Sequence, residues 1–404
     1  VNQGKFLERW KDVLASHYPN GEHVLRARDR AWDRPVVLVV DHYVPQPDRD
    51  AGSRTMVAFI DALLAAGCIV KFWPDNLYLD PHYSQALQAR GVELIYGTRH
   101  AGRFADYLRE VGGELDAVLL SRPHVAPSYL KALRKLAPDV RVTYYGHDLH
   151  FRRMQAEAGV TGRESLAAEA RTMEEQERAL WRGVDHVLYP SQDEADAVRA
   201  LEPQAPASAI VPYAFDHFVT DAVPGFRRGI LFVAGFGHRP NIDAATWLVG
   251  EVMPRVWSRR PDVRLSLVGS NPTPEVRALA GERVEVTGYV DDAELSRRYG
   301  VARVAVVPLR YGAGIKGKVV EALQQGLPLV TTGVGAQGLA GLAEVCQVAD
   351  EADRMADALL RLLEDDAAWS CASAAGAAYA QSRFSRQALS ASLCSILLGR
   401  EETP

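Results

Sequence analysis

Short apolar runs alternate with longer amphipathic stretches along most of the chain. Residues 36–40 (VVLVV) form the clearest run, and residues 56–65 carry apolar side chains at helical spacing before Gly67. Such runs predict strands buried on both faces, and the amphipathic stretches predict helices. Strands that alternate with helices favour βαβ units, in which helices cover both faces of a parallel sheet.

This alternation occurs in two successive series. In the first, strands are expected over residues 36–40, 69–73, 92–96, 117–120, 141–145, 186–189 and 210–212. Helices are expected over residues 56–65, 83–89, 104–111, 129–136, 164–181 and 193–201, the last with Ser191 as its N-cap. In the second, strands are expected over residues 229–233, 265–268, 284–286, 304–307 and 329–331, and helices over residues 244–257 and 374–398.

The length of the chain also favours two domains. Its 404 residues exceed the ~250 to 300 at which a single hydrophobic core stops growing. Residues 216–228 show little periodicity, so we expect domains over residues 1–218 and 219–379, with a C-terminal helix over residues 380–404 packing back on the first. The predicted fold class is α/β, with two doubly wound Rossmann-like domains facing a cleft and ligands in the loops that follow strands.

Charge and composition narrow the function classes. Lys and Arg total 46 against 51 Asp and Glu, a formal net charge of −5, so nucleic acid is not an expected partner. The four cysteines are far apart and form no CxxC pair, which favours a cytoplasmic protein without structural zinc or disulfides. No apolar stretch approaches the ~20 residues that span a bilayer.

Residues 1–30 predict a leading amphipathic helix, with Phe6, Trp10 and Val13 at helical spacing. Two roles stay open for it. It can pack on the first domain or connect it to a preceding one, or it can dock on a membrane surface, which would place the protein peripherally at the inner face of the membrane. The start at Val1 without Met suggests a segment of a larger multidomain chain.

The strongest chemical signal is the sequence GAGIKGKVVE over residues 312–321. It follows the strand expected over residues 304–307 and opens a helix. Glycines let the backbone approach an anion, the first N–H groups of the helix point at it, and two lysines add charge. Lys318 and Glu321 are spaced i, i+3 and therefore share a helix face. The segment thus predicts a phosphate site.

Two alternative roles for this segment have less support. Its glycines and lysines fit the GxxxxGK skeleton of a P-loop, but Val319 has no oxygen for Mg²⁺ where a P-loop needs Ser or Thr. A purely structural glycine-rich turn also stays open.

Residues 229–328 resemble the donor domain of the family 4 glycosyltransferases, which are GT-B enzymes. The resemblance rests on the order and spacing of several short pieces. These pieces are LFVAG (231–235) with RPN (239–241), LVG (267–269), VTGYV (286–290), KVVEAL (318–323) and GLPLV (326–330). The first domain agrees less specifically.

The resemblance implies that the second domain binds the diphosphate of a nucleotide sugar. Glu321 would accept hydrogen bonds from the ribose, while Arg239 and Lys318 would neutralise the leaving group, whose charge grows in the transition state. Further donor contacts are expected at Gly52, Gly237, Val290, Gly314, Ile315 and Lys316. A surface carboxylate paired with Lys318 stays an alternative for Glu321, and a surface arginine for Arg239. Many relatives carry a second Glu where this chain has Ala313, so the sugar contacts must differ.

In the first domain, the sequence YGHD over residues 145–148 follows an expected strand. It resembles the family's histidine at the cleft edge, which implies that His147 is catalytic together with Lys318 and lies near the donor sugar. A histidine that caps the strand, or that bonds to Asp148, stays an alternative.

The loop over residues 45–54 matches the family's glycine loop beside the diphosphate. The resemblance gives Gly52 as a donor contact and Asp50 and Arg54 as acceptor contacts. Asp48 and Asp50 also form a DxD string, which we interpret as a solvated turn and not as a metal site. The histidines show no metal-ligand spacing.

The predicted function is transfer of a hexosyl or deoxyhexosyl group from a nucleotide-diphosphate donor in polysaccharide biosynthesis. The acceptor would be a glycan, a glycolipid or a glycoprotein. No cofactor or metal is expected beyond the nucleotide sugar, and the family implies retention of configuration. Two rival functions stay open, a nucleotide-sugar epimerase of the same fold and a noncatalytic module that binds sugar nucleotides or glycans.

Overall fold

The structure is a computed structural model that describes residues 2–29, 32–161, 164–210, 212–312 and 315–399. It divides into two compact units. The first unit is Val1–Pro212 with Leu389–Pro404, and the second unit is Tyr213–Ala388. The boundary expected between residues 218 and 219 falls inside the second unit.

The first unit contains a seven-stranded sheet with the order β3-β2-β1-β4-β5-β6-β7, and its named strand pairs are parallel. The strands are β1 (Val36–Asp41), β2 (Ile69–Pro74), β3 (Glu93–Leu94), β4 (Ala117–Ser121), β5 (Arg141–Tyr145), β6 (His186–Tyr189) and β7 (Ala207–Ala209). From β1 the chain winds to one edge of the sheet, then returns to β4 and winds to the other. The topological switch point, where such sheets bind ligands, therefore lies between β1 and β4.

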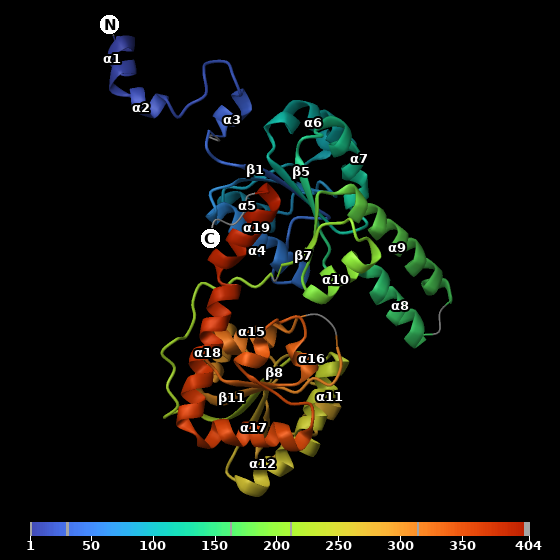
Figure 1. Cartoon of the computed structure of the whole chain (residues 1–404), viewed down its shortest axis with the longest axis vertical. Helices are drawn as coiled ribbons and strands as arrows, with labels where there is room; N and C mark the ends of the chain where they lie inside the picture. The colour runs from blue at the N-terminus through green and yellow to red at the C-terminus, as the bar shows by residue number, and fades with distance from the viewer. Residues whose placement is uncertain (1, 30–31, 162–163, 211, 313–314, 400–404) are drawn as a thin grey trace. The chain divides into compact units, whose positions relative to one another are not determined.

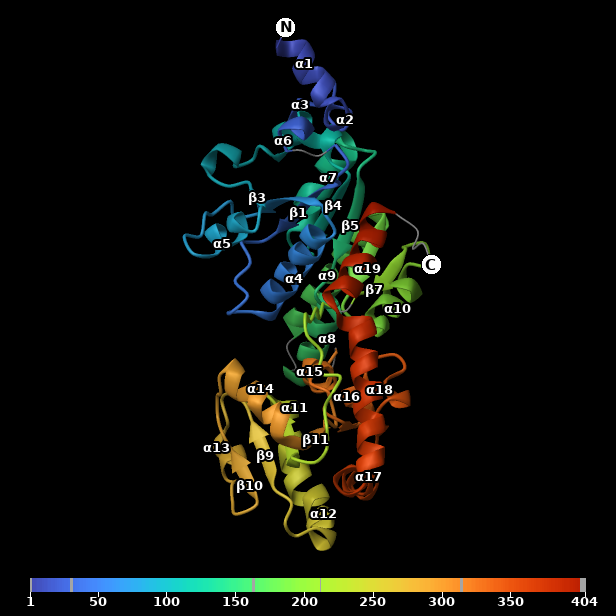
Figure 2. The ribbon, with the colours of Figure 1, turned by 90° about the vertical axis from the view of Figure 1, so that its left-hand side faces the viewer.

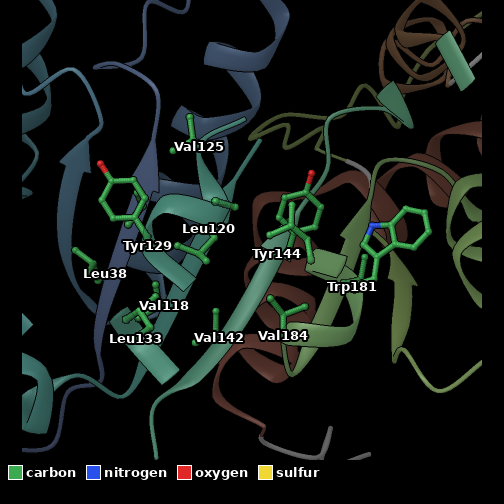
Figure 3. Packing of buried hydrophobic residues seen from close by; sticks show 14 of the residues in the cluster. Leu38, Val118, Leu120, Val125, Tyr129, Leu133, Val142, Tyr144, Trp181 and Val184 are labelled. Atoms are coloured by element: carbon green, nitrogen blue, oxygen red, sulfur yellow. The ribbon is translucent and has the colours of Figure 1, made fainter. Parts of the chain in front are cut away.

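Helices cover both faces of this sheet (Figures 1 and 2). The helices of the first unit are α1 (Asn2–Arg9), α2 (Lys11–Leu14), α3 (Val24–Arg28), α4 (Ala51–Ala65), α5 (Tyr83–Ala89), α6 (Phe104–Val111), α7 (Ala126–Leu136), α8 (His150–Thr161), α9 (Glu164–Gly183), α10 (Gln192–Leu201) and α19 (Arg386–Leu398), with short 3-10 turns at Thr98–His100 and Gly112–Glu114. Of these, α1 and α2 do not lie on the sheet. On one face Leu38 of β1 and Tyr129 of α7 belong to the same buried cluster (Figure 3). On the other, the ring of Phe59 in α4 meets that of Tyr145 in β5.

The second unit repeats this winding in a six-stranded sheet with the order β10-β9-β8-β11-β12-β13. Its strands are β8 (Arg228–Val233), β9 (Leu265–Val268), β10 (Val284–Val286), β11 (Ala302–Val307), β12 (Leu329–Thr331) and β13 (Gln347–Val348). Its helices are α11 (Arg239–Trp247), the π-helical turn η3 (Leu248–Val252), α12 (Met253–Arg259), α13 (Pro274–Arg277), α14 (Asp292–Val301), α15 (Gly317–Gln324), α16 (Gly333–Ala336), the 3-10 turn η4 (Leu342–Glu344), α17 (Ala352–Glu364) and α18 (Asp366–Phe384). Here the switch point lies between β8 and β11. Two doubly wound sheets confirm the predicted fold class.

The helix expected over residues 244–257 is longer and irregular. It begins at Arg239 and passes through η3 into α12. Pro254 lies in the first turn of α12, and because proline has no N–H, the regular hydrogen-bond ladder cannot continue through it.

Two elements of the first unit also differ from expectation. The last strand of the first unit is β7, which ends at Ala209, before the strand expected over residues 210–212, although the Ile210 N–H donates to Tyr189 O over 2.8 Å. Val211, in the middle of that expected strand, lies outside the described residues. Helix α8 was not expected. Its N-terminus is fixed by a carboxylate distant in sequence, since Glu177 Oε2 accepts from the Phe151 N–H over 3.0 Å.

The single helix expected over residues 374–398 is two helices, α18 and α19. They separate at Ser385, whose backbone is extended and bridges to Phe215. In the first unit α19 lies beside α4, where Ser390 Oγ donates to Ala62 O over 2.8 Å. The C-terminal segment therefore contributes a helix to the first unit.

The leading helix is also broken. The described part of residues 1–30 forms α1, α2 and α3, and no residue of α1 or α2 is buried. Phe6, Trp10 and Val13 are exposed, so α1 and α2 bury no apolar side chain. Helix α3 does contact the rest of the first unit, because Arg26 Nη2 donates to Asp116 Oδ2 over 2.7 Å. Of the roles left open for residues 1–30, packing on the first unit is therefore seen for α3.

Candidate active site

At the switch point of the second unit, the loops after β8 and β11 lie against each other. A Cβ atom built on Gly312 would lie 3.9 Å from Pro240 Cβ and 3.9 Å from Lys316 Cε. A second link joins Arg310 to α11, because its Nε donates to Asp243 Oδ2 over 2.9 Å. The predicted contact Gly314, like Ala313, lies outside the described residues.

Lys318 reaches across from α15 to α11. Its Nζ donates to Asn241 Oδ1 over 2.6 Å and lies 5.4 Å from the ring centroid of Phe232. The Asn241 amide in turn donates to Gly235 O over 2.8 Å. Burial, with the charge of Lys316, lowers the pKa of Lys318 to about 8, although Glu321 acts in the opposite direction. The ammonium is thus held at the switch point by a neutral amide.

Glu321 lies one turn further along α15. Its Oε2 accepts from the Tyr299 hydroxyl over 3.3 Å, and burial together with Glu321 raises the pKa of Tyr299 well above its ordinary value. Asn241 and Tyr299 are functional candidates that sequence reasoning missed. Asn241 was visible within the RPN piece, whereas nothing in the sequence connected Tyr299 with Glu321.

The other predicted donor residues of the second unit lie on the same loops. Lys316 is buried at the N-cap of α15, and Ile315 is half-buried beside it. Arg239 and Gly237 are exposed at the start of α11, and Val290 is half-buried after β10. The structure therefore places all described members of this set at the carboxyl ends of β8, β10 and β11.

In the first unit, His147 follows β5. Its Nε2 lies 2.9 Å from Ser121 Oγ at the end of β4, and its ring meets that of Tyr145 edge-on. Asp148 instead pairs with His150 over 2.6 Å and with Arg153. Burial lowers the pKa of His147 to about 4, so the imidazole is neutral near pH 7 and can donate or accept one hydrogen bond.

Buried side chains pack against the loop that carries His147. Gly146 lies against Tyr189, and a Cβ atom there would approach the ring to 2.2 Å. The Tyr189 hydroxyl donates to the fully buried Glu177 over 3.0 Å, the carboxylate that also holds the start of α8. This packing explains why glycine precedes His147.

The loop after β1 carries the remaining predicted residues. Asp50 is the N-cap of α4, because its Oδ1 accepts from the Ser53 N–H over 2.7 Å. Its Oδ2 accepts from the Tyr43 hydroxyl over 2.9 Å. Asp48 accepts from the Tyr83 hydroxyl over 2.6 Å. Gly52 is half-buried in the first turn of α4, and Arg54 is exposed.

Sequence reasoning missed two charged residues at this switch point. Asp41 ends β1 and is buried, and its Oδ1 accepts from Arg122 Nε over 2.7 Å. Burial alone would raise the pKa of Asp41, but His42 and Arg122 lower it to about 2. Arg122, directly after β4, has a φ of 69°. A left-handed backbone at a residue other than glycine is uncommon, and sequence does not reveal it.

A cavity of about 790 Å³ in the second unit lies away from these residues. It is lined from the amino ends of β8, β9 and β11, by residues such as Arg228, Arg264 and Ala302. Since open parallel sheets bind ligands at the carboxyl ends of their strands, we do not assign it to the active site.

The described residues contain neither a metal-ligand cluster nor a helix that could span a membrane. Within residues 2–29, 32–161, 164–210, 212–312 and 315–399, no group of three or more His, Cys, Asp or Glu side chains could hold a metal ion. Within the same ranges, no helix combines the length and apolarity needed to cross a bilayer.

Comparison with known proteins places the second unit in a family. Residues 227–365 match the family described as Glycosyl transferases group 1. Phosphatidyl-myo-inositol mannosyltransferase from Mycolicibacterium smegmatis is 32% identical over 152 residues, which are 36% of this chain and 39% of that protein. The chain thus spans well under half the length of this curated relative.

Solved glycosyltransferase structures match nearly the whole chain in fold. Sucrose-phosphate synthase from Thermosynechococcus elongatus aligns with a TM-score of 0.59 and 19% identity, over 90% of this chain and 98% of that one. HepE from Anabaena, solved with UDP and glucose, aligns with a TM-score of 0.56 and 16% identity, over 91% and 100%. The chain therefore has the GT-B glycosyltransferase fold, and its second unit carries a glycosyltransferase group 1 domain. The predicted resemblance is confirmed, while membership of family 4 stays a prediction.

Proposed function

We propose that the chain is a glycosyltransferase that moves a hexosyl or deoxyhexosyl group from a nucleotide-diphosphate donor to a saccharide, lipid-linked or protein-borne acceptor. The observation that carries the proposal is the placement of Lys318, bonded to Asn241, and of Glu321 within one turn of α15 at the switch point of the second unit. A diphosphate needs cations and helix-start N–H groups, and a ribose needs a carboxylate acceptor. The start of α15 offers both on one helix.

The mechanism follows from the charges. As the bond to the sugar breaks, the nucleoside diphosphate gains negative charge, which Lys318, Lys316 and Arg239 would stabilise without further reorganisation. His147 would position the reacting sugar through its neutral imidazole. We infer retention of configuration and no requirement for a metal ion, both from the resemblance to family 4. Location in the cytoplasm and association with the membrane surface stay predictions.

The names of the similar proteins suggest which nucleotides and which acceptor to test first. HepE was solved with UDP and glucose, and the curated relative is named for transfer of mannose to a phosphatidylinositol. UDP and GDP are therefore the first nucleotides to try, and a glycolipid the first acceptor.

The test is a thermal-shift panel of nucleoside diphosphates followed by a transfer assay. A nucleotide at 100 times its Kd should add about 2.7 kcal/mol to the free energy of unfolding. The matching nucleotide sugar should then release the diphosphate quickly only when an acceptor is present. Recovery of an altered free sugar nucleotide would instead favour the epimerase, and binding without transfer to any acceptor would favour the noncatalytic module.

A further inference from the structure

Three groups of the first unit converge on Gly52, each from a different loop at the carboxyl edge of the sheet. A Cβ atom built on Gly52 would lie 2.7 Å from Arg122 Nη2, 3.2 Å from His147 Nδ1 and 3.3 Å from Asp50 Oδ1. The loops follow β1, β4 and β5, so the point lies at the switch between β1 and β4. His147 is therefore not isolated, because a guanidinium faces the same point.

The guanidinium of Arg122 is held through its Nε atom, while its two terminal nitrogens remain available to a ligand. Its Nε donates to the buried Asp41, which also accepts from the His42 N–H over 2.7 Å. Among the described residues, the two terminal nitrogens of Arg122 have no hydrogen-bond acceptor, and 16% of the side chain is exposed. A guanidinium held in this way presents a rigid pair of N–H donors towards a ligand.

The backbone of Arg122 supports the same conclusion. With φ at 69°, the residue adopts a conformation that glycine or asparagine adopts far more readily. A side chain kept at such a position despite the strain is explained if the side chain itself is needed there.

The charge balance decides which ligand fits. One guanidinium and a neutral imidazole face the carboxylates of Asp41 and Asp50, so this point has no surplus positive charge for a phosphate. Sugar hydroxyls fit better, because each can accept from a guanidinium and donate to a carboxylate. The second unit differs, since its switch point carries several cations.

We propose that Arg122 binds hydroxyl groups of the transferred sugar beside His147 and so helps to determine which sugar is used. The proposal rests on the proposed function, which places the reacting sugar at His147. Asp41 would act as a positioning residue that holds the guanidinium.

The test compares Arg122→Gln with wild type by calorimetric titration of UDP and of UDP-glucose, or of GDP and GDP-mannose if GDP gives the larger thermal shift. We expect UDP affinity to change less than twofold, while kcat/KM for the nucleotide sugar and its binding affinity fall roughly tenfold. Arg109→Gln removes the same charge from the exposed face of α6 and should change neither value.

Arg122→Lys guards against a folding defect, since it keeps a cation beside Asp41 but loses the paired donors. It should melt near the wild-type temperature and still lose affinity for the nucleotide sugar. Equal losses for UDP and UDP-glucose would show a phosphate contact and overturn the proposal. Unchanged binding and kcat/KM with a lowered melting temperature would show a purely structural residue. If wild type transfers no sugar, the proposed function fails, and the UDP-glucose titration still decides the role of Arg122.

Discussion

The two switch points share one topology but differ in charge. In the second unit, the loops and helix starts at the switch point carry four cations, Lys316, Lys318, Arg239 and Arg310, and two carboxylates, Glu321 and Asp243. In the first unit, Arg122 is matched by Asp41 and Asp50, and His147 is neutral. The same fold thus provides an excess of positive charge in one unit and a balanced set of hydrogen-bonding groups in the other. We infer that the second unit binds the diphosphate and the first orients the sugar.

Loss of Lys318 should give the largest effect and sharpen this comparison. Lys318→Ala removes a cation that stabilises charge developing on the leaving group, so kcat should fall by roughly 10²- to 10³-fold. Nucleotide affinity should fall less, because the ground state carries less of that charge. Steady-state kinetics and UDP titration measure both quantities. Lys131→Ala, at an exposed position of α7, is the matched control.

Loss of His147 should lower turnover but leave nucleotide affinity unchanged. If His147 bonds to the reacting sugar as proposed, His147→Ala should lower turnover by about tenfold while nucleotide affinity stays the same. The exposed His82 provides a control as His82→Ala. Parallel losses in turnover and in nucleotide binding would argue that His147 is structural and would break the division of roles between the units.

The pH dependence of nucleotide binding should give the smallest effect. Lysine is cationic below its pKa, and the pKa of Lys318 is lowered to about 8, so its charge is lost as the pH rises from 7 to 9. UDP affinity should therefore weaken by about three- to tenfold between pH 8 and pH 9, because one pKa unit corresponds to about 1.4 kcal/mol. His147, with its pKa at about 4, should not contribute in this range. Lys318→Arg keeps its charge and should bind UDP with a flat profile. The same decline in Lys318→Arg would assign the titration to another group.

Much of the fold could be predicted because buried parallel strands leave continuous apolar runs. The predicted strands 141–145 and 265–268 agree with β5 and β9, and Ser191 caps α10 as expected, its Oγ accepting from the Glu194 N–H. The points at which a helical stretch breaks into two helices could not be predicted in the same way. Ser385 separates α18 from α19 through a pairing with Phe215 that is remote in sequence.

The residues of the candidate active site could also be predicted from the sequence only in part. Glycines and lysines near a strand end indicated the loop that leads into α15, because phosphate binding leaves a local signature. Arg122 left none, since its left-handed backbone and its contact with Asp41 exist only in the folded chain. Tyr299 meets Glu321 from a separate helix for the same reason.

The central claim is that the second unit binds the nucleotide through α15. Titration of Glu321→Gln with the nucleoside diphosphate that most stabilises the wild type tests it most directly. Glutamine keeps the shape but weakens acceptance from the ribose, so affinity should fall by about 1.5 to 3 kcal/mol, with the melting temperature of the free protein nearly unchanged. Unchanged affinity in Glu321→Gln would contradict the donor site proposed here.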